Sequence, residues 1–346
     1  MAVVDWDAAA DIAVRMVPAG PTTTAPEANQ AVAELTELAA AAVQPVRKTT
    51  GMVADVGEHR AAIVDRPEWI RSNVTGMREL LLPLEDRLDK SDAPSWLPSA
   101  AGRVSALEFG LALSWVATKV LGQYEAVVAP GSSNRLLLVA PNIVATERQL
   151  DVPPRDFRMW VALHEETHRV QFGAVPWLEA HFRTEVESLL LEMDTAGTDA
   201  LKRLGAAVVA VIKVLRGAPG ATIIDAIQTP AQREIFLRLT ALMSLLEGHA
   251  DFVMDAAGPE IIPSLPQIRT RFDHRRQSPS AREGLIRRLL GMDAKLKQYS
   301  DGRRFVAEVV ADIGMSGFNR VWESPQMLPS ADEIADPARW LARTGQ

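Results

Sequence analysis

Apolar residues along most of this chain recur every three or four positions, a spacing that places them on one face of an α-helix. Connections between the periodic stretches are predicted over residues 47–60 and 91–102. The predicted helices on either side of the central region cover residues 5–16, 26–44, 67–90, 103–121, 177–196 and 198–216. The C-terminal third is also helical but interrupted, and it ends in a loop and a short closing helix. The pattern predicts a predominantly α protein.

The pattern of apolar residues changes from helical to strand-like between residues 124 and 143. The runs YEAVVAP and NRLLLVAPNI are rich in residues that favour strands, and Gly-Ser-Ser-Asn lies between them. Two such runs around a short polar turn are typical of a β-hairpin. We therefore predict a small β-hairpin or sheet, which makes the fold class α+β with helices dominant.

A further helix is predicted directly after the hairpin. Its apolar positions are Phe157, Trp160, Val161, Leu163 and Val170. Asp151 is the expected N-cap, with Pro153 and Pro154 in the first turn, and Gly173 with Pro176 marks the end.

This helix carries LHEETHRVQF, in which His164, Glu165 and His168 follow the order His-Glu-x-x-His. Positions four apart on a helix differ by only about 40° in azimuth, so both imidazoles project from one face and can bind one metal ion. Glu165 is about 100° round from His164, within range of a water on that metal. Neutral imidazoles suit Zn²⁺, and one more protein ligand plus water would complete a hydrolytic site. The motif predicts a zinc cofactor and hydrolytic chemistry.

The third ligand is expected from another helix, which reads LMSLLEGHADFVMDAAGP. Glu247 and Asp251 lie four apart on one face of it, whereas His249 points about 160° away from Glu247. Glu247 sits among apolar residues, where an unpaired carboxylate would be costly. We therefore predict Glu247 as the third metal ligand.

Other ligand sources are weaker. The extended pattern His-Glu-x-x-His-x-x-Gly-x-x-His fails, because Gln171 and Ala174 stand where its glycine and third histidine belong. His181 and Glu185 also lie four apart on one helical face, but a local surface pair is the better interpretation.

The attacked carbonyl of a substrate needs a donor for the negative charge that builds up on its oxygen. With only two tyrosines in the chain, Tyr299 and His274 are the candidates for this catalytic role. His274 belongs to the basic run RTRFDHRRQSPS, and such runs are usually solvated helix faces.

Composition limits the function classes. The net charge of −7 gives no basic footprint for nucleic acid, and the absence of cysteine excludes thiolate catalysis and cysteine-based zinc sites. Acidic residues stand where a signal peptide needs a basic region, and the apolar segments 107–122 and 205–216 are too short to span a bilayer. We expect a cytoplasmic protein with no membrane or nucleic-acid partner.

The chain shows no internal repeat, low-complexity tract or clear linker. We predict a single domain over residues 1–346. Residues 1–122 form its N-terminal helical part, 123–258 contain the hairpin and both site helices, and 259–346 form the C-terminal helical part.

Four stretches, WVALHEETHRVQFGAVPWL, LVAPNIVATERQL, EGHAD and LPSADEIADPARWL, resemble the zincin-like metallopeptidase family of uncharacterised hydrolases. Some members are catalogued as associated with deazaflavin coenzyme biosynthesis. The resemblance covers most of the chain and implies a mainly helical zincin-like fold, with a metal held by His164 and His168 and with Glu165 as catalytic acid/base. The similarity of Glu-x-x-Ala-Asp to glutamate-type zincins implies Glu247 as third ligand and Asp251 as acceptor of a hydrogen bond from a ligating histidine.

These observations predict a zinc-dependent hydrolase, most simply a peptidase acting on a peptide or amide substrate. The alternative is a non-catalytic zincin-fold scaffold that binds a partner. Glu165 discriminates between them, because a structural metal site has no use for a general base.

Overall fold

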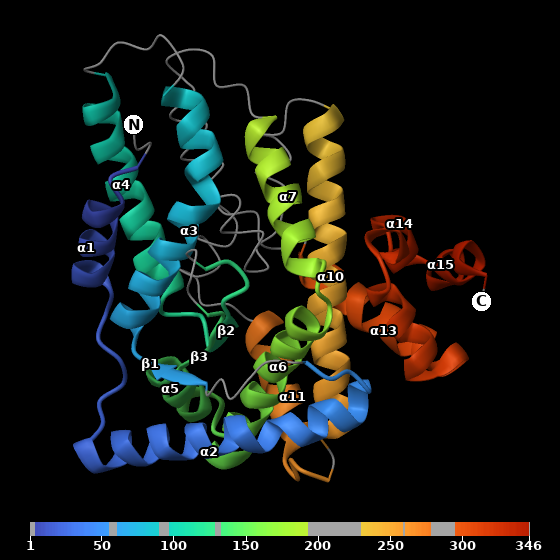
Figure 1. The fold of residues 1–346 in the computed structure, drawn as a ribbon. Helices are drawn as coiled ribbons and strands as arrows, with labels where there is room; N and C mark the ends of the chain where they lie inside the picture. Colours follow the sequence, from blue (N-terminus) through green and yellow to red (C-terminus); the bar gives the residue numbers. More distant parts are fainter. Residues whose placement is uncertain are drawn as a thin grey trace.

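The computed structural model describes residues 4–54, 61–89, 97–128, 133–192, 230–258, 260–277 and 295–345. Its first half contains α1 (Trp6–Met16), α2 (Ala25–Thr50), β1 (Ala62–Val64), α3 (Arg66–Asp89), α4 (Leu97–Val116), β2 (Gly122–Tyr124), β3 (Leu136–Val139) and α5 (Ala140–Leu150). Its second half contains α6 (Pro154–Ala174), α7 (Leu178–Leu191), α10 (Pro230–Ala257), α11 (Leu265–Gln277), α13 (Lys295–Phe318), η2 (Asn319–Trp322), η3 (Pro325–Met327), α14 (Ala331–Ala335) and α15 (Pro337–Thr344). The predicted fold class, predominantly helical with a small sheet, is confirmed (Figure 1). Among the described helices, none is long and apolar enough to cross a membrane.

The sheet has three strands in the order β1-β3-β2. β2 pairs antiparallel with β3, Gly122 opposite Leu138 and Tyr124 opposite Leu136, so an antiparallel pair is present, but β2 overlaps the predicted first run of residues 124–130 only at Tyr124. β1 pairs parallel with β3 and was not predicted, because three residues are too few to show alternation. All four residues of β3 are buried, as expected of a central strand.

The predicted second strand is too long. From Ala140 the chain forms α5, whose second residue is Pro141. Proline fits the first turn of a helix, since its missing N–H has no partner there anyway. Asp151 was predicted to cap α6, and this is wrong: it ends α5 in the left-handed conformation, with φ 51°. The residue that precedes α6 is Pro153, which has no side-chain cap.

Two other boundaries differ from the prediction. The helix predicted over 26–44 continues to Thr50 through Pro45, and buried residues on both sides of that proline hold it in place. The loop predicted over 91–102 is helical from Leu97 onward. The helix predicted over 198–216 lies outside the described residues.

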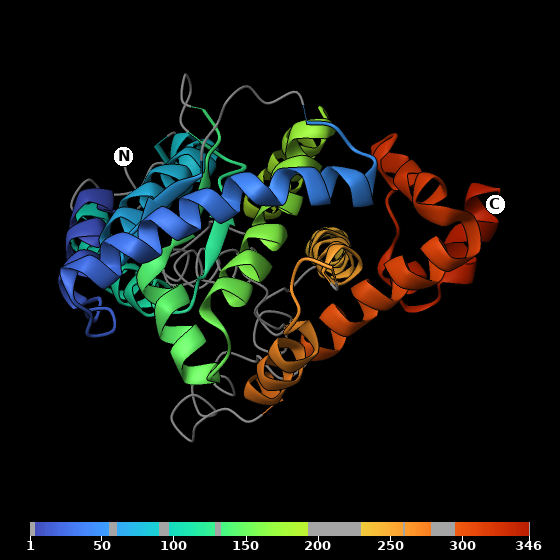
Figure 2. The same ribbon diagram turned by 90° about the horizontal axis from the view of Figure 1, so that it is seen from below.

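α6 lies in the middle of the molecule. It packs on α2, which runs across the base of the view in Figure 1, and on α10. The apolar positions predicted for α6 are all buried: Phe157, Trp160, Val161, Leu163 and Val170. Viewed from below, α10 lies between α6 on one side and α13 on the other (Figure 2).

The contact between α10 and α13 is made through glycine. A Cβ at Gly248 would lie 2.2 Å from the carbonyl carbon of Gly302, and one at Gly302 would lie 2.1 Å from the carbonyl oxygen of Ser244. Real Cβ atoms do not approach backbone this closely. The two helices can therefore touch only because both positions lack a side chain.

The predicted closing helix of the tail consists of two short helices, α14 and α15. Ser330 begins α14 with a capping box that includes Glu333. The fully buried Trp340 of α15 donates its Nε1–H to the carbonyl of Met327 at 2.8 Å. These contacts hold the end of the chain against α13.

Candidate metal centre

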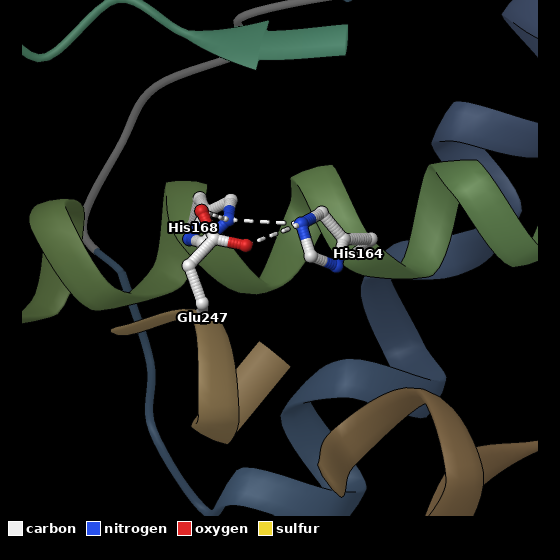
Figure 3. Close-up of side chains that lie close together, drawn as sticks. All are labelled: His164, His168 and Glu247. Carbon is white, nitrogen blue, oxygen red and sulfur yellow. Dashed lines mark hydrogen bonds and ion pairs between the residues drawn. The ribbon is translucent and has the colours of Figure 1, made fainter. Parts of the chain in front are cut away.

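His164 and His168 project from the same face of α6, as the spacing predicts. Their Nε2 atoms are 3.1 Å apart, and both rings are partly buried. The buried face of α6 fixes the orientation of the helix, so the two imidazoles have one direction in common, toward α10 (Figure 3).

Glu247 projects from α10 toward both rings (Figure 3). Its Oε2 is 3.5 Å from Nε2 of His164, and its Oε1 is 3.7 Å from Nε2 of His168. One candidate ligand atom from each of the three residues can be chosen so that all lie within 4.8 Å of one another. The structure thus brings together the three residues that the sequence suggested as ligands.

The ligand triangle formed by His164, His168 and Glu247 suits zinc. Nitrogen and carboxylate ligands about 2.0–2.1 Å from a tetrahedral ion are separated from each other by about 3.3–3.4 Å. The two Nε2 atoms are 3.1 Å apart, and each lies near that distance from one Glu247 oxygen, His164 3.5 Å from Oε2 and His168 3.7 Å from Oε1. Two neutral imidazoles and a carboxylate are also the donor set of a catalytic zinc site, in which a fourth position stays open. The residues present therefore fit the metal.

The charges in this group are strongly coupled. Burial lowers the pKa of His164, but the hydrogen bond and negative charge of Glu247, with Glu165 and Asp251 adding to them, raise it overall to about 9. At His168, burial and the positive charge of His164 lower the pKa. Because a metal ligand must be an unprotonated imidazole, a metal bound here would displace a proton from His164.

Glu165 is buried on the side of α6 that faces the sheet, where Gly122 of β2 lies against it. A Cβ at residue 122 would lie 2.5 Å from Cγ of Glu165 and 2.7 Å from its Cδ. Burial raises the pKa of Glu165 to about 7, opposed by the positive charge of His164 and supported by the negative charge of Glu247. Among the described residues no group forms a hydrogen bond with its Oε2.

Gln171 was not predicted as part of the site, and the structure shows that it contacts a candidate ligand. Its Oε1 lies 2.8 Å from Nδ1 of His168, and its Nε2 lies 2.9 Å from the carbonyl oxygen of Leu246. The sequence showed Gln171 only as a departure from another zincin pattern. The sequence carries no signal for this role, because the burial that makes a glutamine need hydrogen-bond partners here comes from the packing of α6 on α10.

Asp251 has a different partner from the predicted one. Its Oδ1 is 3.5 Å from Nη1 of Arg269, and its backbone carbonyl accepts a hydrogen bond from Nη2 of the same arginine at 3.0 Å. Within the described part of the chain no hydrogen bond joins Asp251 to either histidine; at His168 the acceptor is Gln171. The arginine on α11 draws the carboxylate to its side, and Asp251 acts on the histidines through its charge.

The remaining candidates lie as follows. His249 is fully buried on α10 with its Nδ1 3.0 Å from Nε2 of Gln171. Glu185 pairs with Arg238 at 3.0 Å, while the ring of His181 packs against Trp177. His274 is exposed on α11, and Tyr299 lies in α13 but its side chain is outside the described residues. The role of His274 and Tyr299 at the oxyanion stays a prediction.

The contact at Gly122 gives a testable prediction. Gly122→Ala should displace the Glu165 carboxylate and lower any metal-dependent hydrolysis by up to about 10²-fold, since a shift of about 1 Å in a catalytic group can cost that much. Zinc content should not change, because the three candidate ligands lie on α6 and α10 and not on β2. Steady-state kinetics and metal analysis of the variant measure both.

Gln123→Ala is the matched control. Gln123 is the next residue of β2, and its side chain contacts Trp69 and Asn73 of α3 instead of α6. The control should lose stability with little change in turnover per folded molecule. Equal turnover in wild type and Gly122→Ala would show that the strand does not position Glu165.

Comparison with known proteins agrees with the fold. The family model described as zincin-like metallopeptidase matches residues 4–341, so the chain belongs to the zincin-like metallopeptidase family. This family implies a metal ion, usually zinc, and supports a hydrolase. The chain is also similar to a solved structure from Chloroflexus aurantiacus, described as a candidate hydrolase with a novel fold. The two share 29% sequence identity over 99% of each chain, with a TM-score of 0.71. No curated protein matches the chain.

Proposed function

We propose that this protein is a zinc-dependent hydrolase that cleaves a peptide or amide bond. The observation that carries the proposal is the meeting of His164 and His168 from α6 with Glu247 from α10, while the adjacent Glu165 is buried beside them. A metal in this triangle would supply a Lewis acid that polarises the scissile carbonyl and lowers the pKa of a bound water toward about 7.

Glu165 is the proton carrier of the proposed reaction. In the attack it takes a proton from the water, and afterwards it delivers that proton to the leaving amine. A group that both accepts and donates a proton near neutral pH works best when its own pKa is near that pH. The raised pKa of the buried carboxyl supports this assignment.

The position of β2 supports an extended peptide as the substrate. β2 lies at the edge of the sheet, and Gln123 stands opposite Leu137 in its pairing with β3. Next to β2, the carbonyl of Leu121 accepts a backbone hydrogen bond from Val139, and the N–H of Glu125 donates one to Arg135. In an antiparallel ladder the intervening residues turn their backbone N–H and C=O groups to the other side. Gly122 therefore directs both its backbone N–H and C=O away from β3, and Tyr124 its N–H, so a substrate strand can pair there; the Tyr124 carbonyl already accepts a hydrogen bond from Ala126 at 3.0 Å.

The test combines metal analysis with a substrate screen. Protein purified without chelator or metal-affinity tag should contain about one zinc per chain. It should also cleave members of a peptide library, detected by mass spectrometry, with loss on chelation and recovery on adding zinc. His168→Ala should abolish both, whereas His181→Ala should change neither, because His181 lies against Trp177 on α7. Failure of the wild type to bind zinc would refute the proposal, and zinc binding without turnover would favour the scaffold function.

A further inference from the structure

Gln171 connects the two helices that carry the candidate ligands. It is fully buried on α6, three residues after His168, so it lies almost one helical turn further on the same side. Its side-chain oxygen and nitrogen contact different partners. Oε1 lies 2.8 Å from Nδ1 of His168, and Nε2 lies 2.9 Å from the Leu246 carbonyl and 3.0 Å from Nδ1 of His249.

The chemistry of the partners decides which end of the amide faces which group. The carbonyl oxygen of Leu246 can only accept a hydrogen bond, so the amide end next to it must be the NH₂ group. The oxygen of Gln171 must then face His168, and since an amide oxygen only accepts, Nδ1 of His168 must donate. That tautomer leaves the lone pair on Nε2, the atom that lies 3.1 Å from His164 and 3.7 Å from Glu247.

His249 reinforces this arrangement. Its Nδ1 is within hydrogen-bond distance of the second amide hydrogen, so the NH₂ group has two acceptors, one from the backbone and one from a ring. The ring of His249 packs against Phe318 at 5.1 Å and Trp322 at 5.6 Å between centroids. Turning the amide over would place its oxygen against the Leu246 carbonyl, and two acceptors in a buried site repel each other.

The same amide also fixes the position of the third ligand. Leu246 immediately precedes Glu247, so the hydrogen bond from Gln171 holds the turn of α10 from which the carboxylate projects. From these contacts we infer that Gln171 is the positioning residue of the metal centre, setting both the tautomer of His168 and the distance from α6 to Glu247. The inference rests on the proposed function in one respect, that the triangle holds a metal.

The experiment compares Gln171→Met with a matched variant, Gln232→Met. Gln232 is also a buried glutamine that donates to a backbone carbonyl, that of Glu192 at 2.7 Å, but it lies 15 residues from Glu247 on α10, about 22 Å along the helix. Both variants should lose thermal stability. Zinc affinity, measured by competition with a chromophoric chelator, should fall about 10–100-fold in Gln171→Met only.

A second readout follows the tautomer itself. In metal-free wild type, the ¹⁵N shifts of the His168 ring should show Nδ1 protonated, and in Gln171→Met this form should no longer dominate. Gln171→Glu keeps an acceptor for His168 but has no NH₂ group for Leu246. It should therefore retain the tautomer and recover part of the affinity lost in Gln171→Met. His249→Phe keeps a ring against Phe318 and Trp322 and leaves the Leu246 contact, so its loss of affinity should be less than about tenfold.

Several outcomes would overturn the inference. If Gln171→Met binds zinc as tightly as Gln232→Met does, Gln171 only links the two helices and does not position the metal centre. Lost affinity with an unchanged His168 tautomer in Gln171→Met would show that the residue does not act through the ring. If Gln171→Met does not fold, Gln171→Glu carries the test, and a lost tautomer there refutes the role. These readouts need no substrate, so a lack of hydrolysis would not affect them, whereas zinc retained by His168→Ala would refute the metal centre itself.

Discussion

Glu165→Gln should lower peptide hydrolysis by roughly 10²–10⁴-fold, the usual contribution of general acid/base catalysis. Glutamine has nearly the same size and helix propensity as glutamate but cannot accept a proton at neutral pH. The ligand triangle is untouched, so zinc content should remain as in the wild type. Steady-state kinetics on a cleaved library peptide, together with metal analysis, measure the effect.

Glu166→Gln provides the control for this prediction. Glu166 is the next residue of α6 and is also buried, but its carboxylate pairs with Arg169 at 2.6 Å. The control should therefore cost stability, because it leaves a partly buried arginine without its full partner, and turnover per folded molecule should change little. Undiminished activity in Glu165→Gln would exclude Glu165 as the base. A substrate retained but uncut by Glu165→Gln would also give a route to the natural substrate.

Gly248→Ala should destabilise the protein by about 3 kcal/mol or more, at the upper end of the range for overpacking. In an exposed helix interior the same change stabilises by up to about 1 kcal/mol, so the sign of the effect is diagnostic. Here the added Cβ would meet the backbone of Gly302, which cannot rotate away as a side chain could. Denaturant unfolding of the variant and the wild type gives the difference in free energy.

Gly302→Ala tests the same contact from the other helix, where the added Cβ would meet the carbonyl of Ser244. Once one alanine has separated α10 from α13, the second has less to disrupt. The double variant should therefore lose less stability than the sum of the single variants. Additive losses, or a more stable Gly248→Ala, would show that the glycine contact does not set the distance between the helices.

The parts of the site that the sequence predicted are those encoded on single helices. His164 and His168 need only the four-residue spacing, which any helix converts into a common face. Glu247 comes from a separate helix, and the prediction used the cost of an unpaired carboxylate among apolar residues. That Glu247 lies next to the two histidines depends on how α10 packs on α6, which the structure supplies.

The residues that were missed take their roles from tertiary contacts. Gln171 is an ordinary helical residue until Leu246 and His249 are placed beside it, and Gly122 until Glu165 is. Asp251 was given a histidine as its partner from the similarity of Glu-x-x-Ala-Asp to glutamate-type zincins, and nothing in its own helix indicates Arg269. Asp151 was misassigned as a cap because its neighbourhood suits a helix start, while the structure uses it to end the preceding helix.

The contact between Gly122 and Glu165 has a consequence for where a substrate is cut. Paired strands repeat every two residues, so a peptide beside β2 can move only in steps of about 6.8 Å if it is to keep its hydrogen bonds. Because Gly122 of β2 lies against Glu165, the proton carrier of the proposed reaction, each allowed step would present one particular bond to that carboxylate. On the proposed function, backbone pairing with β2 sets which bond of the substrate is cut. Every second side chain of the substrate then points away from the enzyme and does not influence that choice.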